Sequence, residues 1–231
     1  MPRFAVILPA AGRSSRFGSA EKKVFAVLDG RTVWRRSAEL FVARPDVCQC
    51  IVVAAPEDRD RFGAAPADGR VEIADGGAER FESVANALAR TTAEAEFVAV
   101  HDAARPCLTA ELIDKVFDRA AETGAAMLAV RVADTVKRDD GQGRVVATVP
   151  REGLWLAQTP QVFRRDWLLD AYARRAALGA GVTDDAQLVE AAGYAVYLVP
   201  GSGANLKITT REDLDLAEAV LRARRAETQA R

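Results

Sequence analysis

The sequence contains few cysteines, a single histidine and no long apolar run, and each of these scarcities excludes a class of protein. Cys48, Cys50 and Cys107 form neither a disulfide framework nor a zinc-ligand pattern, so we expect free thiols in a reducing compartment. No apolar stretch approaches the about 20 residues that span a bilayer, and residues 4–8 are too few for a secretory signal. We therefore expect a cytoplasmic protein without a membrane partner.

An excess of charge of either sign is also missing. The formal net charge is −1, from 32 Lys and Arg against 33 Asp and Glu. Affinity for nucleic acid comes largely from excess cations that neutralise phosphates, so we expect no nucleic-acid partner. The balance leaves room for a local basic pocket. With 49% hydrophobic residues, the 231-residue chain can bury a substantial core.

Apolar segments alternate along the chain with segments of helical periodicity. Continuous apolar strands separated by helices are typical of a parallel sheet that is covered on both faces, which predicts an α/β fold in a single domain over residues 1–231. A capping box at residues 210–213 opens the last helix, and residues 226–231 are expected to fray. The expected strands cover residues 4–8, 50–54, 97–100, 126–130 and 195–199, and the expected helices residues 32–44, 79–90, 111–123, 165–178, 184–192 and 210–225.

The alternation breaks between residues 133 and 155. Two β-prone runs flank residues 139–143, whose sequence DDGQG is a strong turn signal. This pattern predicts a projecting β-hairpin arm at about residues 134–154. An isolated hairpin is marginally stable in water, so we expect the arm to pack on a second subunit in a homodimer.

A loop rich in small residues follows the first expected strand. Residues 8–18 read LPAAGRSSRFG, and two lysines come shortly after. Small residues let a backbone approach a ligand closely, and its N–H groups can hold phosphates, while Arg16 and Lys23 add positive charge. The loop is not a Walker A motif, and Ser14 replaces the middle glycine of a dinucleotide-binding motif. The pattern indicates an anion-binding loop, with an ordinary strand-to-helix connection as the alternative.

A second polar segment, HDAARP at residues 101–106, follows the expected strand at 97–100. Both segments then lie at the carboxyl ends of strands, where open parallel sheets bind ligands. Asp102 is suited to hold a magnesium ion or a ribose hydroxyl, or alternatively pairs only with Arg105. The lone His101, directly after an apolar strand, is more typical of a hydrogen-bonded core residue than of a catalyst.

Other hydroxyl and cationic side chains are scattered through the second half of the chain. Thr135 and Arg151 lie on the expected arm, Thr159 follows it, and Thr183 and Lys207 come later. Such groups suit a phosphorylated polyol. Each alone has a simpler interpretation: a helix cap for Thr183, a solvated charge for Arg151 and a surface lysine for Lys207.

Taken together, these motifs resemble those of the 2-C-methyl-D-erythritol 4-phosphate cytidylyltransferases of the non-mevalonate isoprenoid pathway. The resemblance runs in order from about residue 4 to the last helix. It implies a Rossmann-like core, CTP and Mg²⁺ as co-reactants, and an arm exchanged in a homodimer. The motifs are PAAG at residues 9–12 with the following Arg and Lys, DGG at 75–77 with a following Arg, HDAARP at 101–106, DTVKR at 134–138, QTPQ at 158–161, TDD at 183–185 and NLKIT at 205–209.

The resemblance also implies a reaction. CMP is transferred from CTP to 2-C-methyl-D-erythritol 4-phosphate, giving 4-diphosphocytidyl-2-C-methyl-D-erythritol and pyrophosphate. The acceptor phosphate is already anionic near neutral pH, so it can attack the α-phosphorus in line without a general base. The alternatives are another polyol phosphate acceptor such as ribitol 5-phosphate, another nucleotide, or a non-catalytic nucleotide-binding subunit.

Residue roles follow from the resemblance by matching position. The residues implied to bind CTP are Ala10, Ala11, Gly12, Gly77, Ser83 and Asp102, with Asp102 at the ribose or the metal. The implied catalytic cations are Arg16, Lys23 and Lys207. The implied acceptor-binding residues are Arg105, Thr135, Arg151, Thr159 and Thr183, of which Thr135 and Arg151 come from the arm of the partner.

The sequence departs from the family pattern at three positions. Ser14 replaces a glycine, which could stiffen the loop. Lys22 replaces a proline and leaves two adjacent lysines as candidates, although the spacing favours Lys23. Ala78 replaces an aspartate and removes one side-chain contact to the base, so recognition there depends on the backbone.

Overall fold

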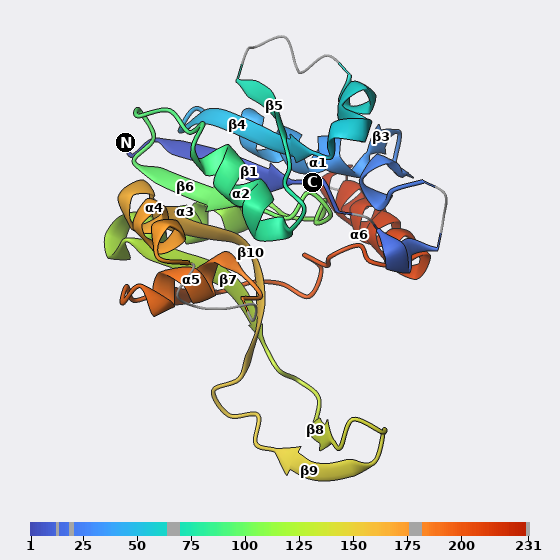
Figure 1. The fold of residues 1–231 in the computed structure, drawn as a ribbon. Coiled ribbons are helices and arrows are strands. Elements are labelled where there is room, and N and C mark those ends of the chain that lie inside the picture. The colour runs from blue at the N-terminus through green and yellow to red at the C-terminus, as the bar shows by residue number, and fades with distance from the viewer. Residues whose placement is uncertain (13, 19–20, 64–69, 176–181, 230–231) are drawn as a thin grey trace.

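The computed structural model describes residues 1–12, 14–18, 21–63, 70–175 and 182–229. Its centre is a seven-stranded sheet in the order β11-β7-β10-β6-β1-β4-β5 (Figure 1). Neighbouring strands are parallel except at β10, which runs antiparallel to both β6 and β7. The strands are β1 (Phe4–Pro9), β4 (Val47–Ala54), β5 (Val71–Asp75), β6 (Phe97–Val100), β7 (Ala125–Arg131), β10 (Trp155–Arg164) and β11 (Tyr197–Pro200).

Helices cover both faces of this sheet, as the apolar pattern predicts. Side chains alternate along β1: Val6 and Leu8 pack with α1 and α3, whereas Ile7 packs with α2, α4 and α5. Buried strands with two covered faces explain the continuous apolar runs in the sequence. The helices are α1 (Val33–Val42), α2 (Arg80–Leu88), α3 (Ala110–Thr123), α4 (Arg165–Ala173), α5 (Asp185–Ala191) and α6 (Arg211–Gln229).

The last helix packs beside the loop that follows β1. Its residue Ala217 is buried with Phe17, Leu28 and Ile208 in a third apolar cluster, next to the short strands β2 (Val27–Leu28) and β3 (Arg31–Thr32). The predicted capping box is present, since the N–H of Asp213 donates to the Thr210 hydroxyl at 3.3 Å and the Thr210 N–H donates to the carboxylate of Asp213 at 2.8 Å. The helix continues to Gln229, so the expectation of fraying from residue 226 is wrong for residues 226–229; residues 230–231 lie outside the described residues.

Two strands of the sheet are not anticipated by the apolar pattern. The edge strand β5 is only partly buried, and β10 carries buried polar residues in its middle. The ladder between β10 and β7 is interrupted between Ala157 and Gln161, where Gln158 and Thr159 lie. The expected helix at 165–178 ends at Ala173; residues 176–181 lie outside the described residues.

The predicted β-hairpin arm is present and projects from the body of the molecule (Figure 1). It consists of β8 (Val136–Asp139) and β9 (Val145–Val149), paired antiparallel. Asp140 shapes the turn by accepting the N–H of Gln142 at 3.0 Å. Within the part of the chain that is described, no helix is long and apolar enough to cross a bilayer, and Cys48, Cys50 and Cys107 are not joined in disulfides.

Candidate active site

A cavity of about 540 Å³ lies at the carboxyl ends of the central strands. The loops after β1, β4, β5 and β6 form it together with the short helix Lys23–Phe25 and Lys207. This is the edge at which open parallel sheets bind ligands. The cavity brings together eight of the residues singled out from the sequence: Ala10, Ala11, Gly12, Lys23, Gly77, Ser83, Asp102 and Lys207.

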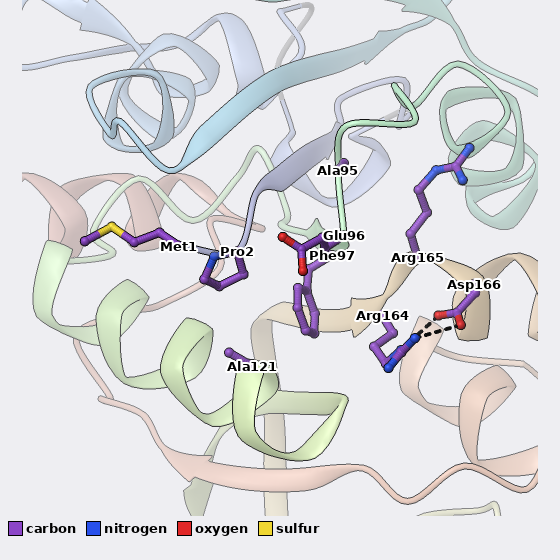
Figure 2. Close-up of a pocket in the computed structure, with 9 residues that line it drawn as sticks. All are labelled: Met1, Pro2, Ala95, Glu96, Phe97, Ala121, Arg164, Arg165 and Asp166. Atoms are coloured by element: carbon purple, nitrogen blue, oxygen red, sulfur yellow. Dashed lines mark hydrogen bonds and ion pairs between the residues drawn. The ribbon is translucent and has the colours of Figure 1, made fainter.

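A larger hollow of about 670 Å³ lies elsewhere, beside the amino-terminal start of β6 (Figure 2). Its cations already have partners: Arg164 pairs with Asp166, and Arg165 donates to the hydroxyl of Thr91 at 3.0 Å. We therefore place the site in the smaller cavity, where cationic side chains meet a loop of small residues.

The loop after β5 needs glycine because other atoms lie very close to its backbone. A Cβ atom on Gly76 would lie 2.8 Å from the Cβ of Ala11, and one on Gly77 would lie 2.3 Å from the Cβ of Glu82. The Ser83 hydroxyl accepts the N–H of Gly77 at 3.1 Å and donates to the Glu79 carbonyl at 3.2 Å. Ser83 therefore shapes the loop, and the backbone of the loop faces the cavity.

The two adjacent lysines have different environments. Lys22 pairs with Asp58 and, at 3.1 Å, with Glu57; burial opposes its charge, but these carboxylates raise its pKa. Lys23 lines the cavity, and burial together with the nearby cations Lys207 and Arg16 lowers its pKa to about 8. A lysine placed among cations is suited to neutralise an incoming anion, which supports Lys23 as the functional lysine.

Ser14 adopts the left-handed conformation that favours glycine, with φ at 55°. Its hydroxyl accepts the N–H of Lys23 at 3.3 Å, which ties the loop to the lysine. A glycine in the same place would adopt this conformation without strain but would lack the hydroxyl. This departure from the family pattern is therefore compatible with the loop.

Asp102 lies among three cations. Its carboxylate is 2.9 Å from Lys207 Nζ, 3.4 Å from Arg105 Nε and 3.9 Å from Arg80 Nε. Burial alone would raise the pKa of Asp102, but Lys207, Arg80 and Arg105 together hold it well below its usual range. Asp102 is thus anionic near neutral pH and lines the cavity, and it does not pair only with Arg105, because Lys207 lies closer to its carboxylate.

Arg80 is a cavity residue to which the sequence analysis gave no role. It lines the cavity at the start of α2, and its guanidinium is held by the buried carboxylate of Asp185 at 2.7 Å. Burial opposes the charge of Arg80, but Asp185 and Asp102 outweigh burial and raise its pKa. One feature of the sequence could have predicted this role: Arg80 is the Arg that follows DGG, at the amino end of an expected helix.

Thr159 and His101 lie just beneath the cavity. Thr159 is buried, and its Oγ1 accepts the N–H of Asp102 at 3.0 Å. His101 is fully buried beside it, and burial lowers the His101 pKa to about 4, which confirms the interpretation as a hydrogen-bonded core residue.

The remaining candidate residues do not line the cavity. Arg16 is exposed on a short helix but close enough to Lys23 to influence its pKa. Arg105 points to Asp102 and to the carbonyl oxygen of Asn205, 2.8 Å away. The remaining three residues are exposed: Thr183, and Thr135 and Arg151 on the arm. Thr183 contacts the side chain of Gln187 at the start of α5.

A family model described as IspD, 2-C-methyl-D-erythritol 4-phosphate cytidylyltransferase, matches residues 4–223. The chain belongs to this family. A 2-C-methyl-D-erythritol 4-phosphate cytidylyltransferase of Rhodopirellula baltica is 44% identical over 238 residues, which cover 96% of both chains. The bifunctional enzyme IspD/IspF of Rhodospirillum rubrum is 46% identical over 226 residues, 96% of this chain and 58% of that one.

Solved structures of the IspD family have the same fold. The enzyme of Thermus thermophilus matches with a TM-score of 0.78 and 35% identity, over 96% of this chain and all of that one. An Anaerococcus prevotii synthase matches with a TM-score of 0.83 at 28% identity, over 96% and 99%. Membership in the IspD family confirms the expected fold class, the nucleotidyltransferase class and the cytidylyltransferase activity on methylerythritol phosphate.

Proposed function

We propose that the cavity of about 540 Å³ is the CTP site in which CMP is transferred to 2-C-methyl-D-erythritol 4-phosphate. The observation that carries this assignment is the convergence of Lys23 and Lys207 on a loop of small residues. The lowered pKa of Lys23 reflects cations that are brought together in a partly dry site. A polyanion such as a triphosphate relieves this repulsion.

The mechanism is in-line attack of the acceptor phosphate on CTP. An anionic oxygen of the acceptor forms a bond to the α-phosphorus while the bond from that phosphorus to the bridging oxygen breaks, and pyrophosphate leaves with the electron pair. The two polyanions repel each other, so catalysis comes from positioning and charge neutralisation. Lys23, Arg16 and Lys207 supply the positive charge.

The donors around the cavity fit a magnesium ion that is held mainly by phosphates. Among the described residues, no group of three or more His, Cys, Asp and Glu side chains could hold a metal alone. Mg²⁺ in nucleotide enzymes takes one or two carboxylates together with substrate phosphates, and Asp102 would supply one. When bound, the ion neutralises phosphate charge, and Asp102 also has Lys207 as a partner at 2.9 Å.

The nucleoside end of CTP is assigned to the loops after β1 and β5. Ala10, Ala11 and Gly12 line the cavity together with Gly77, whose N–H donates to the hydroxyl of Ser83. Since Ala78 carries no polar group, cytosine is recognised by backbone N–H and C=O groups. Backbone groups held in a fixed loop provide such recognition without an additional side chain.

The acceptor is assigned to the side of the cavity near Arg105 and Thr183, completed by Thr135 and Arg151 from a second copy of the chain. The arm supports a homodimer because its apolar side chains face solvent in the single chain. Val145 and Val146 on β9 are each more than half exposed, as is Leu156 on β10, next to the end of the arm. Packing on a partner would remove this apolar surface from water.

Release of pyrophosphate from CTP and Mg²⁺ tests the proposal with two acceptors. We expect turnover with 2-C-methyl-D-erythritol 4-phosphate and little with ribitol 5-phosphate. Turnover of ribitol 5-phosphate in preference would assign a different acceptor to the same chemistry. Absence of turnover with both in the folded protein, with turnover when CTP is replaced by another nucleotide, would contradict the CTP assignment.

A further inference from the structure

His101 is the one histidine of the chain, and the proposed mechanism does not use it. Its ring is completely buried against Phe41, with the ring centres 5.2 Å apart. Its Nδ1 lies 3.0 Å from Thr159 Oγ1, and its Nε2 lies 3.2 Å from the carbonyl oxygen of Arg105. The ring therefore bridges two segments that meet under the cavity.

The neighbouring hydrogen bonds determine which ring nitrogen carries the proton. The N–H of Asp102 donates to Thr159 Oγ1 at 3.0 Å, which leaves the Thr159 hydroxyl proton free to be donated to His101 Nδ1. Nδ1 is then the acceptor, and Nε2 carries the hydrogen that is donated to the carbonyl of Arg105. The neutral Nε2–H form satisfies every polar group in this chain of bonds.

These bonds hold both ends of one short turn. The N–H of Arg105 donates to the Asp102 carbonyl at 2.9 Å, so residues 102–105 form the turn. His101 holds the first end through Thr159 and the second end through the Arg105 carbonyl. Asn205 steadies the same unit, because its side-chain amide donates to the Thr159 carbonyl at 3.0 Å and its own carbonyl accepts from the Arg105 guanidinium.

We infer that His101, with Thr159, is a positioning residue for cytidylyl transfer: its Nε2–H ring fixes Asp102 on the nucleotide side relative to Arg105 on the acceptor side. The inference rests on the proposed function, in which Asp102 and Arg105 contact different substrates. The Thr159 hydroxyl is committed to Asp102 and His101, so Thr159 acts through Asp102. Small displacements of such supporting groups typically reduce activity or affinity about 10-fold to 100-fold.

Two substitutions of His101 separate the two ends of the bridge. In His101→Asn the amide oxygen replaces Nδ1 as acceptor for Thr159 but nothing reaches the Arg105 carbonyl. We expect the KM for the acceptor to rise about tenfold or more, with the KM for CTP little changed. In His101→Gln the amide nitrogen replaces Nε2, so the KM for CTP is expected to rise instead.

Substitutions of Thr159 provide the matched control. Thr159→Ser keeps the hydroxyl, so its KM values for CTP and for the acceptor are expected to stay nearly normal. Thr159→Val keeps the shape but loses the hydroxyl, so its KM for CTP should rise as it does in His101→Gln. Equal changes in both KM values for all variants, or losses of stability with unchanged constants, would show that the bridge has only a structural role.

The imidazole of His101 in the unmodified protein gives a second readout. This measurement does not depend on whether a variant folds. Because the chain has one histidine, the ring nitrogens give one pair of ¹⁵N NMR signals. We expect a protonated Nε2 and an unprotonated Nδ1 near neutral pH. A protonated Nδ1 and an unprotonated Nε2 in an active enzyme would overturn this inference but not the proposed function. Failure of turnover with both acceptors would overturn the proposed function, and the inference with it.

Discussion

At the scale of single residues, the site is defined by the contrast between Lys22 and Lys23. The side chain of Lys22 pairs with the carboxylates of Asp58 and Glu57, whereas that of Lys23 lines the cavity near the cations Lys207 and Arg16. Burial lowers the pKa of both lysines, but the carboxylates beside Lys22 outweigh it, whereas the cations beside Lys23 add to it. The sequence alone allowed either lysine to be functional, because the partners of each are distant in the chain.

The lowered pKa of Lys23 predicts proton uptake on CTP binding. In the free protein, burial and the cations Lys207 and Arg16 oppose its charge, while Asp102 and Asp213 favour it, and the balance puts its pKa at about 8. A bound triphosphate raises this pKa. Lys23 is already protonated below about pH 8, so CTP affinity is expected to fall as pH rises through about 8, with uptake of up to about one proton near pH 9.

Calorimetry of CTP binding in buffers of different ionisation enthalpy measures this uptake. CTP releases or binds protons of its own, so the same titration on Lys23→Ala supplies the baseline. The difference between the two proteins should be close to zero near neutral pH and should grow above about pH 8. A difference that is absent throughout the alkaline range would contradict the assignment of Lys23 to the triphosphate.

At the scale of elements, the site depends on the close approach of the loops after β1 and β5. Gly76→Ala would place a methyl group 2.8 Å from the Cβ of Ala11 and 3.2 Å from the carbonyl oxygen of Ala54. We expect the free energy of unfolding to fall by about 1–3 kcal/mol and the KM for CTP to rise, because the loops must separate.

Urea denaturation and steady-state kinetics measure the two effects, with Gly203→Ala as the control. No atom lies within 4 Å of a Cβ built on Gly203, so this variant should match the unmodified protein. A Gly76→Ala protein with unchanged stability and an unchanged KM for CTP would show that the loops are not packed as described.

Most of the strands that the sequence predicted share one property, a continuous apolar pattern, whereas the arm was predicted from its turn signal and the last helix was marked by its capping box. The strands β1, β4, β6 and β7 and the helix α3 are buried by such runs and were located to within a few residues. The strand β10 was missed because Gln158, Thr159 and Gln161 interrupt its apolar run with buried polar groups. Those groups form hydrogen bonds across the fold, as between Gln161 and Asp184, 2.8 Å apart, which local periodicity does not show.

The candidate site was predictable where it follows strand ends. The loops at residues 8–18 and 101–106 were located because ligands bind at the carboxyl ends of parallel strands. Arg80 was overlooked because its importance comes from Asp185, a residue distant in the sequence. The network around His101 likewise requires three segments to meet, and no single segment shows it.

At the scale of the whole molecule, the proposed homodimer predicts that each active site is shared. Thr135 and Arg151 lie on the arm, outside the cavity of their own chain. If a partner supplies them, each site of a homodimer contains Lys23 of one chain and Arg151 of the other. Two inactive variants could then complement each other in a mixed dimer.

Mixed dimers of Lys23→Ala and Arg151→Ala test this arrangement. Each variant alone should have little activity. Co-refolding in equal amounts gives mixed dimers in about half of the population, each with one intact site, so activity should return to about a quarter of that of the unmodified enzyme. If no activity returns, the arm either contributes to the site of its own chain or contributes to no site.

A mixture of Lys23→Ala with Lys207→Ala is the control for this experiment. Both residues line the cavity of their own chain, and neither lies on the arm. Each site of a mixed dimer therefore still lacks one of the two lysines, and no activity should return. Recovery in this mixture as well would show that it comes from something other than exchange of the arms.

The most direct test of the central claim compares pyrophosphate release by Lys23→Ala and Lys22→Ala with CTP, Mg²⁺ and 2-C-methyl-D-erythritol 4-phosphate. Removing a fixed donor to developing charge costs about 10²–10³ in rate, so kcat/KM of Lys23→Ala should fall by at least about 10²-fold. Lys22→Ala should lose stability, because Asp58 loses a partner, and stay close to the unmodified rate. A loss of less than about tenfold in folded Lys23→Ala, or an equal loss in Lys22→Ala, would contradict the account.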